Sequence, residues 1–293
     1  MKPRQRGTTL ALTSAASFGV MPVLTKIVYD DGAGIAGVLS IRFSLAALVL
    51  AVIAKLRHET LPGGRQLVTL FLLGAVGYVV ESLCYFTALT TISAGLTALL
   101  LYLYPALVVV LTAVLTRVRP SSMSTLCVVV ATAGTALTIG PVGGGQGRGV
   151  LLGLAAALSY SIYIVVSGRF AAGVGPFATS AVVMTGAAVV YDVGAVSVRS
   201  SVPTHATAWL ALVGIALVGT VVAVSTFFAA LELLGPADTA MISTVEPVVS
   251  VVVASIALGE RLSALQVLGG ALVLSAVGFL ARTAQASVPL DAP

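Results

Sequence analysis

The chain has 293 residues, of which 58% are hydrophobic and only 9% are charged. Soluble domains carry about 25% charged residues, so the composition excludes a water-soluble globular protein and indicates a polytopic membrane protein. The net charge of +5 does not predict a nucleic-acid partner, because the lysines and arginines lie at the ends of long apolar runs, where they set membrane topology.

Ten apolar segments follow one another along the chain, separated by short turns such as Gly235-Pro236. A spanning helix needs about 20 apolar residues, and backbone groups in lipid must be hydrogen-bonded within their own element. We therefore predict an all-α membrane protein with ten transmembrane helices. Their approximate limits are residues 8–28, 35–55, 67–90, 94–116, 122–140, 149–168, 176–198, 208–231, 237–258 and 263–282.

The first segment follows Lys2, Arg4 and Arg6, as the apolar part of a signal peptide does. It is as long as a full span and many similar segments follow, so we expect it to be retained as the first helix. Placing the N-terminus inside puts most lysines and arginines on the cytoplasmic side, which predicts a plasma-membrane protein with both termini in the cytoplasm. Lys26 is expected to reach the outer interface, near which Asp192 also lies.

The sequence repeats at an offset of 142 residues, which aligns Pro105 with Pro247 and Phe86-x-Ala88-Leu89 with Phe228-x-Ala230-Leu231. We expect two five-helix repeats, 8–140 and 149–282, joined by the glycine-rich stretch from Pro141 to Gly149. An odd number of spans per repeat forces the second copy to lie upside down. Inverted repeats that share a site at the membrane midplane are a design typical of transporters.

Short motifs in this order resemble the drug/metabolite transporter superfamily, of the EamA-like kind. The resemblance extends over nearly the whole chain, and its motifs are Ser17-Phe18-Gly19, Ile41-Arg42-Phe43, Tyr85-Phe86-Thr87-Ala88-Leu89, the stretch Ala98 to Pro105, Glu246-Pro247, Gly259-Glu260-Arg261-Leu262 and Gly269-Gly270-Ala271. One departure is Val118-Arg119, where the second repeat has Glu260-Arg261. The resemblance implies ten helices, inverted repeats and export of small metabolites such as amino acids.

Three charged residues lie deep within predicted spans, where a charge is costly and faces the bundle interior or a water-filled cavity. Arg42 either captures a substrate carboxylate or ties helices through helix-end carbonyls or a glutamate, and we assign it a structural or gating role. Glu246 is expected to be a gate, an ammonium contact or a proton site, or else an ion-paired or carbonyl-bonded group beside Pro247. Glu81 has the apolar Ala223 as its counterpart, which argues against a purely scaffolding role.

Aromatic residues gather in the predicted third, fourth and sixth helices, where rings with hydroxyls line a pocket or simply pack against one another. The cluster comprises Tyr78, Tyr85, Phe86, Tyr102, Tyr104, Tyr160 and Tyr163. The predicted substrate-binding set is Tyr78, Glu81, Tyr85, Tyr102, Tyr160, Tyr163, Phe227 and Glu246. Pro105 and Pro247 are expected to kink their helices, as static bends or as hinges near the transport pathway.

The motifs of metal-dependent, nucleophilic and nucleotide-driven enzymes are missing from the sequence. His58 and His205 lie in predicted loops, while Cys84 and Cys127 lie in apolar runs as small buried side chains. We therefore expect no cofactor, no metal and no enzymatic activity. The predicted function is export of amino acids or similar amphiphiles by alternating access, either secondary active or facilitative, by a monomer in the lipid bilayer. The alternatives are a drug, pigment or nucleobase exporter and an intramembrane enzyme.

Overall fold

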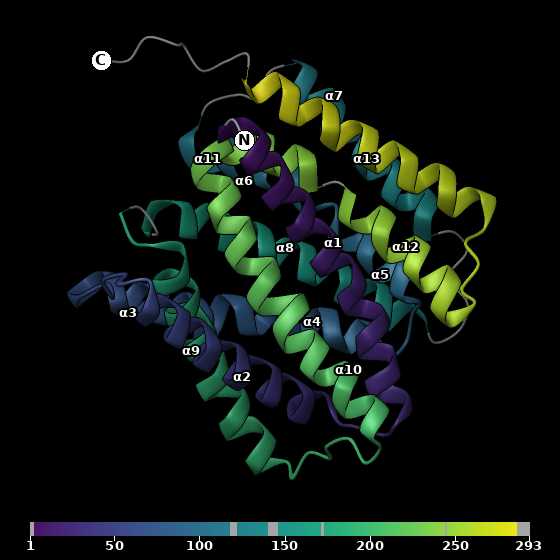
Figure 1. Ribbon diagram of the computed structural model, residues 1–293. Coiled ribbons are helices and arrows are strands. Elements are labelled where there is room, and N and C mark those ends of the chain that lie inside the picture. The colour runs from purple at the N-terminus through teal and green to yellow at the C-terminus, as the bar shows by residue number, and fades with distance from the viewer. Residues whose placement is uncertain (1–2, 118–121, 140–145, 171–172, 244, 286–293) are drawn as a thin grey trace.

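A computed structural model describes residues 3–117, 122–139, 146–170, 173–243 and 245–285, and every regular element in these ranges is a helix. Lys2, Arg119 and the first part of the stretch that begins at Pro141 lie outside the described residues. The first turn of α1 and the last turn of α13 lie at the same end of the bundle (Figure 1).

The first repeat contains five spans, of which two are interrupted. The third span passes through a π-helical turn, and the fourth is broken into two helices. The elements are α1 (Pro3–Asp30), α2 (Ile35–Leu56), α3 (Gly64–Leu72) with η1 (Leu73–Tyr78) and α4 (Val79–Ala88), α5 (Ala94–Leu101) with α6 (Tyr104–Thr116), and α7 (Ser122–Ile139).

The second repeat has the same plan, including the π-helical turn in its third span. Its elements are α8 (Gln146–Phe170), α9 (Pro176–Ser197), α10 (Ala206–Ala216) with η2 (Leu217–Val222) and α11 (Ala223–Ser243), α12 (Val245–Leu258) and α13 (Ala264–Gln285). Seven helices of the described chain are long and apolar enough to cross a membrane, and the shorter apolar stretches Thr125–Leu137, Val245–Leu258 and Ala264–Ala276 supply the other three. The predicted ten-helix, all-α membrane fold is confirmed.

The helix that contains the eighth span extends past the predicted turn, although the spanning stretch itself ends at Leu234, directly before it. A turn was expected at Gly235-Pro236, but α11 continues to Ser243 and α12 begins at Val245. A proline within a membrane helix is tolerated when neighbouring groups satisfy the carbonyl that it frees.

Packing between the repeats follows the expected inversion, because helices at equivalent positions exchange roles. The second helices of the two repeats, α2 and α9, pack on each other, as do the fifth helices, α7 and α13. The first helix of each repeat packs on the third and fourth spans of the other: α1 contacts α11 and α12, while α8 contacts α4 and α6. Figure 1 shows α7 beside α13 at one edge and α1 beside α10 and α11 across the middle.

Two glycines allow the π-helical turn η1 to lie directly against α9. A Cβ added at Gly74 would collide with the backbone carbonyl of Val183, and one added at Gly186 would collide with the carbonyl of Phe71. Backbones approach this closely in membrane proteins where small residues line the contact. These glycines set the distance between the first repeat's third span and the second repeat's second span.

Hydrogen bonds also join loops of the two repeats at one end of the bundle. Asp31, between α1 and α2, accepts hydrogen bonds from the backbone N–H groups of Thr204 (2.5 Å) and His205 (3.1 Å), and it contacts the His205 ring. The Thr204 N–H, together with the His205 ring and N–H, lowers the pKa of Asp31 to about 2. We call this set of contacts the Asp31 tie.

Two more sets of hydrogen bonds join the repeats at the end of the bundle that holds the Asp31 tie. Lys26 Nζ of α1 donates to the carbonyl of Ile92 at 2.9 Å, and Glu260 accepts from the N–H groups of Ala94 and Gly95 at 2.9 and 3.2 Å. Lys26 therefore links α1 to the loop before α5, in addition to its expected place near the interface. At the opposite end, Glu59 accepts from the N–H of Ala178 at 2.8 Å.

Candidate functional site

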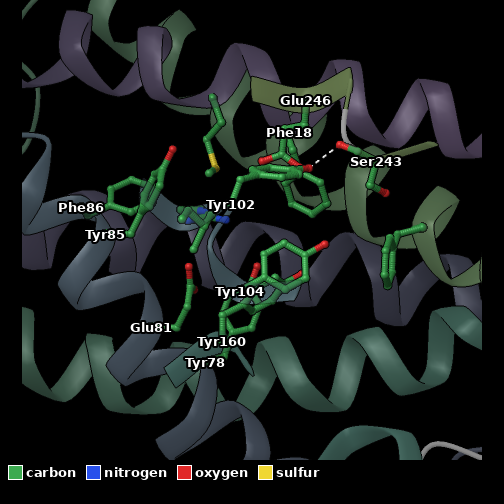
Figure 2. A pocket seen from close by; sticks show the side chains of 14 residues that line it. Phe18, Tyr78, Glu81, Tyr85, Phe86, Tyr102, Tyr104, Tyr160, Ser243 and Glu246 are labelled. Atoms are coloured by element: carbon green, nitrogen blue, oxygen red, sulfur yellow. Dashed lines mark hydrogen bonds between the residues drawn. The ribbon is translucent and has the colours of Figure 1, made fainter. Parts of the chain in front are cut away.

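A cavity between the two repeats brings together charged, hydroxyl-bearing and aromatic side chains. Its lining residues are Phe18, Met21, Arg42, Tyr78, Glu81, Tyr85, Phe86, Leu101, Tyr102, Tyr104, Tyr160, Phe227, Ser243 and Glu246. Figure 2 shows Glu81 on the side of the cavity away from Ser243 and Glu246. The cavity volume is about 40 Å³, which leaves room for a few water molecules.

The lining residues fall largely into pairs related by the 142-residue offset. Phe18 pairs with Tyr160, Tyr85 with Phe227, Leu101 with Ser243 and Tyr104 with Glu246, and both members of each pair line the cavity. The cavity therefore lies where equivalent positions of the inverted repeats face each other.

Arg42 is fixed by contacts to both repeats. It is 1% exposed, its Nε donates to Thr220 Oγ1 at 2.8 Å, and its guanidinium lies 4.6 Å and 4.9 Å from the ring centroids of Phe43 and Phe86. Within the described part of the chain, no carboxylate lies within 4.0 Å of the guanidinium. Arg42 is thus held by the Thr220 hydroxyl and two rings, and the Tyr78 hydroxyl is a further hydrogen-bond partner.

Thr220 owes its position to the π-helical turn η2. Its hydroxyl accepts from Arg42 and donates to the carbonyl of Ile215, five residues earlier, at 3.0 Å. Such turns free backbone groups from the regular helical pattern and are frequent at functional sites. In the other repeat, η1 ends at Tyr78, the offset partner of Thr220, and Tyr78 lines the cavity.

Glu246 lies in α12 and contacts the broken fourth span. The Tyr102 hydroxyl, in the break between α5 and α6, lies 3.0 Å from Glu246 Oε2 and also contacts the carbonyl of Ser243. Tyr102 is 1% exposed. This contact joins the interrupted segments of the two repeats inside the cavity.

Residues 5–140 and 147–282 each match the EamA-like transporter family, and together they span most of the chain. The chain belongs to the EamA-like transporter family. It is similar to a solved structure titled only "Crystal structure of protein", with a TM-score of 0.70 and 22% identity over 95% of this chain and 98% of the other. That likeness shows a shared fold. No curated protein matches the chain.

In this EamA-like transporter, the predicted binding residues lie together with one exception. Tyr78, Glu81, Tyr85, Tyr102, Tyr160, Phe227 and Glu246 all line the cavity, and so does Arg42, which was predicted to be structural or gating. Tyr163 lies behind the lining, with its ring centroid 5.6 Å from that of Tyr78 and 6.1 Å from that of Tyr160. It supports two lining rings.

The predicted binding set lacked six lining residues, Phe18, Met21, Phe86, Leu101, Tyr104 and Ser243, of which Phe86 and Tyr104 had been placed in the wider aromatic cluster. The repeat carried a signal for two of the others, because Phe18 and Met21 are the offset partners of the predicted Tyr160 and Tyr163. Ser243 was not predictable in this way, since its offset partner Leu101 is an apolar residue in an apolar run.

The two matched prolines lie in helices next to the cavity. Pro105 follows the break at Tyr102 and Leu103 and is in the first turn of α6, and Pro247 lies in α12. The first helical turn has no hydrogen-bond partner for its N–H groups, so proline fits there without loss. Their role as hinges stays a prediction.

Outside the cavity, the charged residues that the structure describes do not form a metal site. Asp192 accepts from Ser40 Oγ (2.5 Å) and Ser44 Oγ (3.0 Å), which ties α9 to α2. The part of the chain that the structure describes holds no cluster of three or more His, Cys, Asp or Glu side chains suited to a metal ion. Among these residues the cavity is therefore the candidate site.

Proposed function

We propose that the protein exports amino acids or similar small amphiphiles across the plasma membrane by alternating access, as a monomer with both termini in the cytoplasm. The observation that carries this proposal is the cavity at the repeat interface, in which one fixed cation, two carboxyl groups and several aromatic rings face a shared space. The family consists of transporters, which supports transport over catalysis.

The charges in the cavity favour a substrate with two charged ends. The guanidinium of Arg42 suits a carboxylate, while Glu81 and Glu246 suit an ammonium group. Tyr85, Phe227 and neighbouring rings offer an apolar and cation-binding surface for a side chain. The alternative, a drug, pigment or nucleobase exporter, would use the same rings without needing both signs of charge.

The cavity is too small to hold a substrate in this conformation. Its volume is about 40 Å³, whereas pockets that hold drug-sized ligands have roughly 300–1,000 Å³. Substrate entry therefore requires the repeats to move apart at one end. The Asp31 tie and the contacts of Lys26 and Glu260 lie at one end, and the Glu59 contact at the other. Breaking one set while keeping the other would open the cavity to one side.

Counterflow in proteoliposomes tests this proposal. Purified protein is reconstituted with a high internal concentration of one unlabelled amino acid, and entry of the labelled form is followed for each member of a panel of amino acids, nucleobases and cationic dyes. We expect transient accumulation of a subset of amino acids, with a loss of at least about tenfold in Arg42→Ala. Arg65→Ala, which removes an exposed arginine outside the cavity, is the matched control.

The contrary results are also defined. Accumulation of nucleobases or dyes but of no amino acid would replace the substrate class with the alternative. If no compound of the panel moves with wild-type protein that retains its helical circular dichroism, the transport proposal is wrong for this panel's chemistry.

A further inference from the structure

A groove runs along the paired fifth helices of the two repeats, α7 and α13, which lie side by side at one edge of the bundle (Figure 1). Its volume is about 320 Å³. The lining residues are Met123, Leu126, Cys127 and Val130 of α7 and Ser275, Ala276 and Phe279 of α13. None of these residues is charged, and those of α7 recur at the spacing of one helical face.

The sizes of the side chains explain the groove. Its buried lining residues, Cys127 and Ala276, have small side chains, whereas the larger Met123 and Phe279 are exposed. Further along α7 the two helices touch, because a Cβ added at Gly134 would lie 2.7 Å from a backbone oxygen of α13. The helices run in opposite directions, so the groove lies on the side of this contact where α7 begins and α13 ends.

The groove reaches from the hydrocarbon region to the membrane surface. The apolar stretches of the two helices are Thr125–Leu137 and Ala264–Ala276, so Met123 and Phe279 lie just beyond them. Lipid tails are as apolar as leucine, and an empty groove would leave its lining atoms without contacts. Cys127 is seven residues from Gly134, or about 10 Å along the helix, so the space beside the backbone contact suits one acyl chain better than a second helix.

Exposed arginines lie at the same end of the bundle. Arg117 ends α6, which packs on α7, and Arg4 and Arg6 are in the first turn of α1. The exposed acidic residue near the start of α1 is Glu232 of α11, so positive charge predominates on these helix ends. A guanidinium binds a phosphate through paired hydrogen bonds.

We propose that this groove binds one acyl chain of an anionic phospholipid and that Arg117 holds the phosphate of the same molecule. A zwitterionic headgroup also carries an ammonium group, which the same arginines repel, so the site selects the anionic lipid. The bound chain contacts the fifth helices of both repeats and joins them. This site is separate from the central cavity and does not rest on the proposed transport function.

Fluorescence quenching by brominated lipids tests the site. Trp209→Phe removes the single native tryptophan, and a reporter is introduced by Phe279→Trp in the groove or by Leu48→Trp at an exposed position of α2. Each protein is reconstituted in phosphatidylcholine with a small fraction of brominated phosphatidylglycerol or brominated phosphatidylcholine. In Phe279→Trp we expect about fivefold higher apparent affinity for the anionic lipid, the factor that one arginine contributes at a membrane surface. Leu48→Trp should respond equally to both lipids.

Second substitutions in the Phe279→Trp protein test the two parts of the site. Arg117→Gln should remove the preference for the anionic lipid, whereas Arg65→Gln, which changes an exposed arginine at the start of α3, should keep it. Ala276→Leu fills the groove and should weaken quenching by both lipids. Circular dichroism verifies that each variant keeps its helices.

Three results would overturn the proposal. Equal quenching of Phe279→Trp by the two lipids would show that the groove meets only bulk lipid. A preference that Arg117→Gln leaves unchanged would show that this arginine does not hold the headgroup. Failure of both lipids to quench Phe279→Trp, while both quench Leu48→Trp, would show that a protein surface such as a second copy of the chain covers the groove.

Discussion

Thr220 is the residue on which the position of Arg42 depends. The hydroxyl is fully buried and receives the guanidinium Nε at 2.8 Å. Thr220→Val keeps the shape of the side chain but leaves a buried cation without this acceptor, so we expect a loss of about 1.5–3 kcal/mol in unfolding free energy. Substrate affinity should fall as well, because Arg42 loses its fixed direction.

Denaturation in detergent and a binding isotherm measure these two effects. Thr226→Val is the matched control, since the Thr226 hydroxyl donates to carbonyls of the preceding turn of its own span, those of Val222 at 2.6 Å and Ala223 at 3.3 Å. Equal stability of the two variants would show that Thr220 does not hold Arg42.

The charged residues of the candidate site could be predicted from the sequence, whereas their hydrogen-bond partners could not. Arg42, Glu81 and Glu246 stand out because ionisable residues are rare inside spans. A link from Arg42 to helix-end carbonyls or a glutamate was expected, but the partner is the hydroxyl of Thr220. An isolated threonine in an apolar run gives no sign of its partner, because the pairing depends on how η2 turns it.

At the scale of elements, the contact of η1 with α9 depends on Gly74. An added methyl group would meet the backbone carbonyl of Val183, which cannot move without shifting α9. We expect Gly74→Ala to destabilise the protein by about 1–3 kcal/mol, as overpacking does, and to slow substrate flux. Thermal unfolding in detergent gives the first effect and counterflow the second.

Gly194→Ala is the control for this change, because Gly194 lies in α9, the helix that Gly74 faces, and an added methyl group there meets nothing within 4 Å. Alanine in an open helical position stabilises by up to about 1 kcal/mol. A stabilised Gly74→Ala would mean that the two backbones are further apart than described.

The number of helices and the matched positions of the prolines could be predicted from the sequence, but the π-helical turns could not. Apolar runs of about 20 residues predicted ten spans, and the 142-residue offset placed Pro105 and Pro247 at equivalent positions of the two repeats. The π-helical turns Leu73–Tyr78 and Leu217–Val222 have no comparable signal, since their residues suit an ordinary helix. Tertiary packing decides them, as it decided that α11 passes Gly235-Pro236.

At the scale of the whole molecule, the Asp31 tie controls one end of the bundle. Asp31→Asn removes the charge that receives the N–H groups of Thr204 and His205, so we expect their amides to exchange hydrogen faster. Asp30→Asn, a change at the adjacent exposed residue, is the control. Unchanged exchange of both amides in Asp31→Asn would show that the carboxylate is dispensable.

The same tie has a predictable pH dependence. Because folding lowers the pKa of Asp31 to about 2, its contribution is fully present above the ordinary aspartate pKa of about 4 and is lost as the pH falls through about 2. Amide protection of Thr204 and His205 should therefore persist in mildly acidic buffer. Loss of protection already near neutral pH would show that the Asp31 carboxylate does not hold these amides.

The pairs that line the cavity have a consequence for energetics. A perfectly duplicated protein would be degenerate: exchanging the shapes of its halves would give two forms of equal free energy. Here Ser243 is the offset partner of Leu101, and Glu246 that of Tyr104. Each divergence lifts that degeneracy, so under the proposed alternating access we expect the empty protein to prefer one orientation, and restoring identical side chains at one pair should bring the two populations closer together.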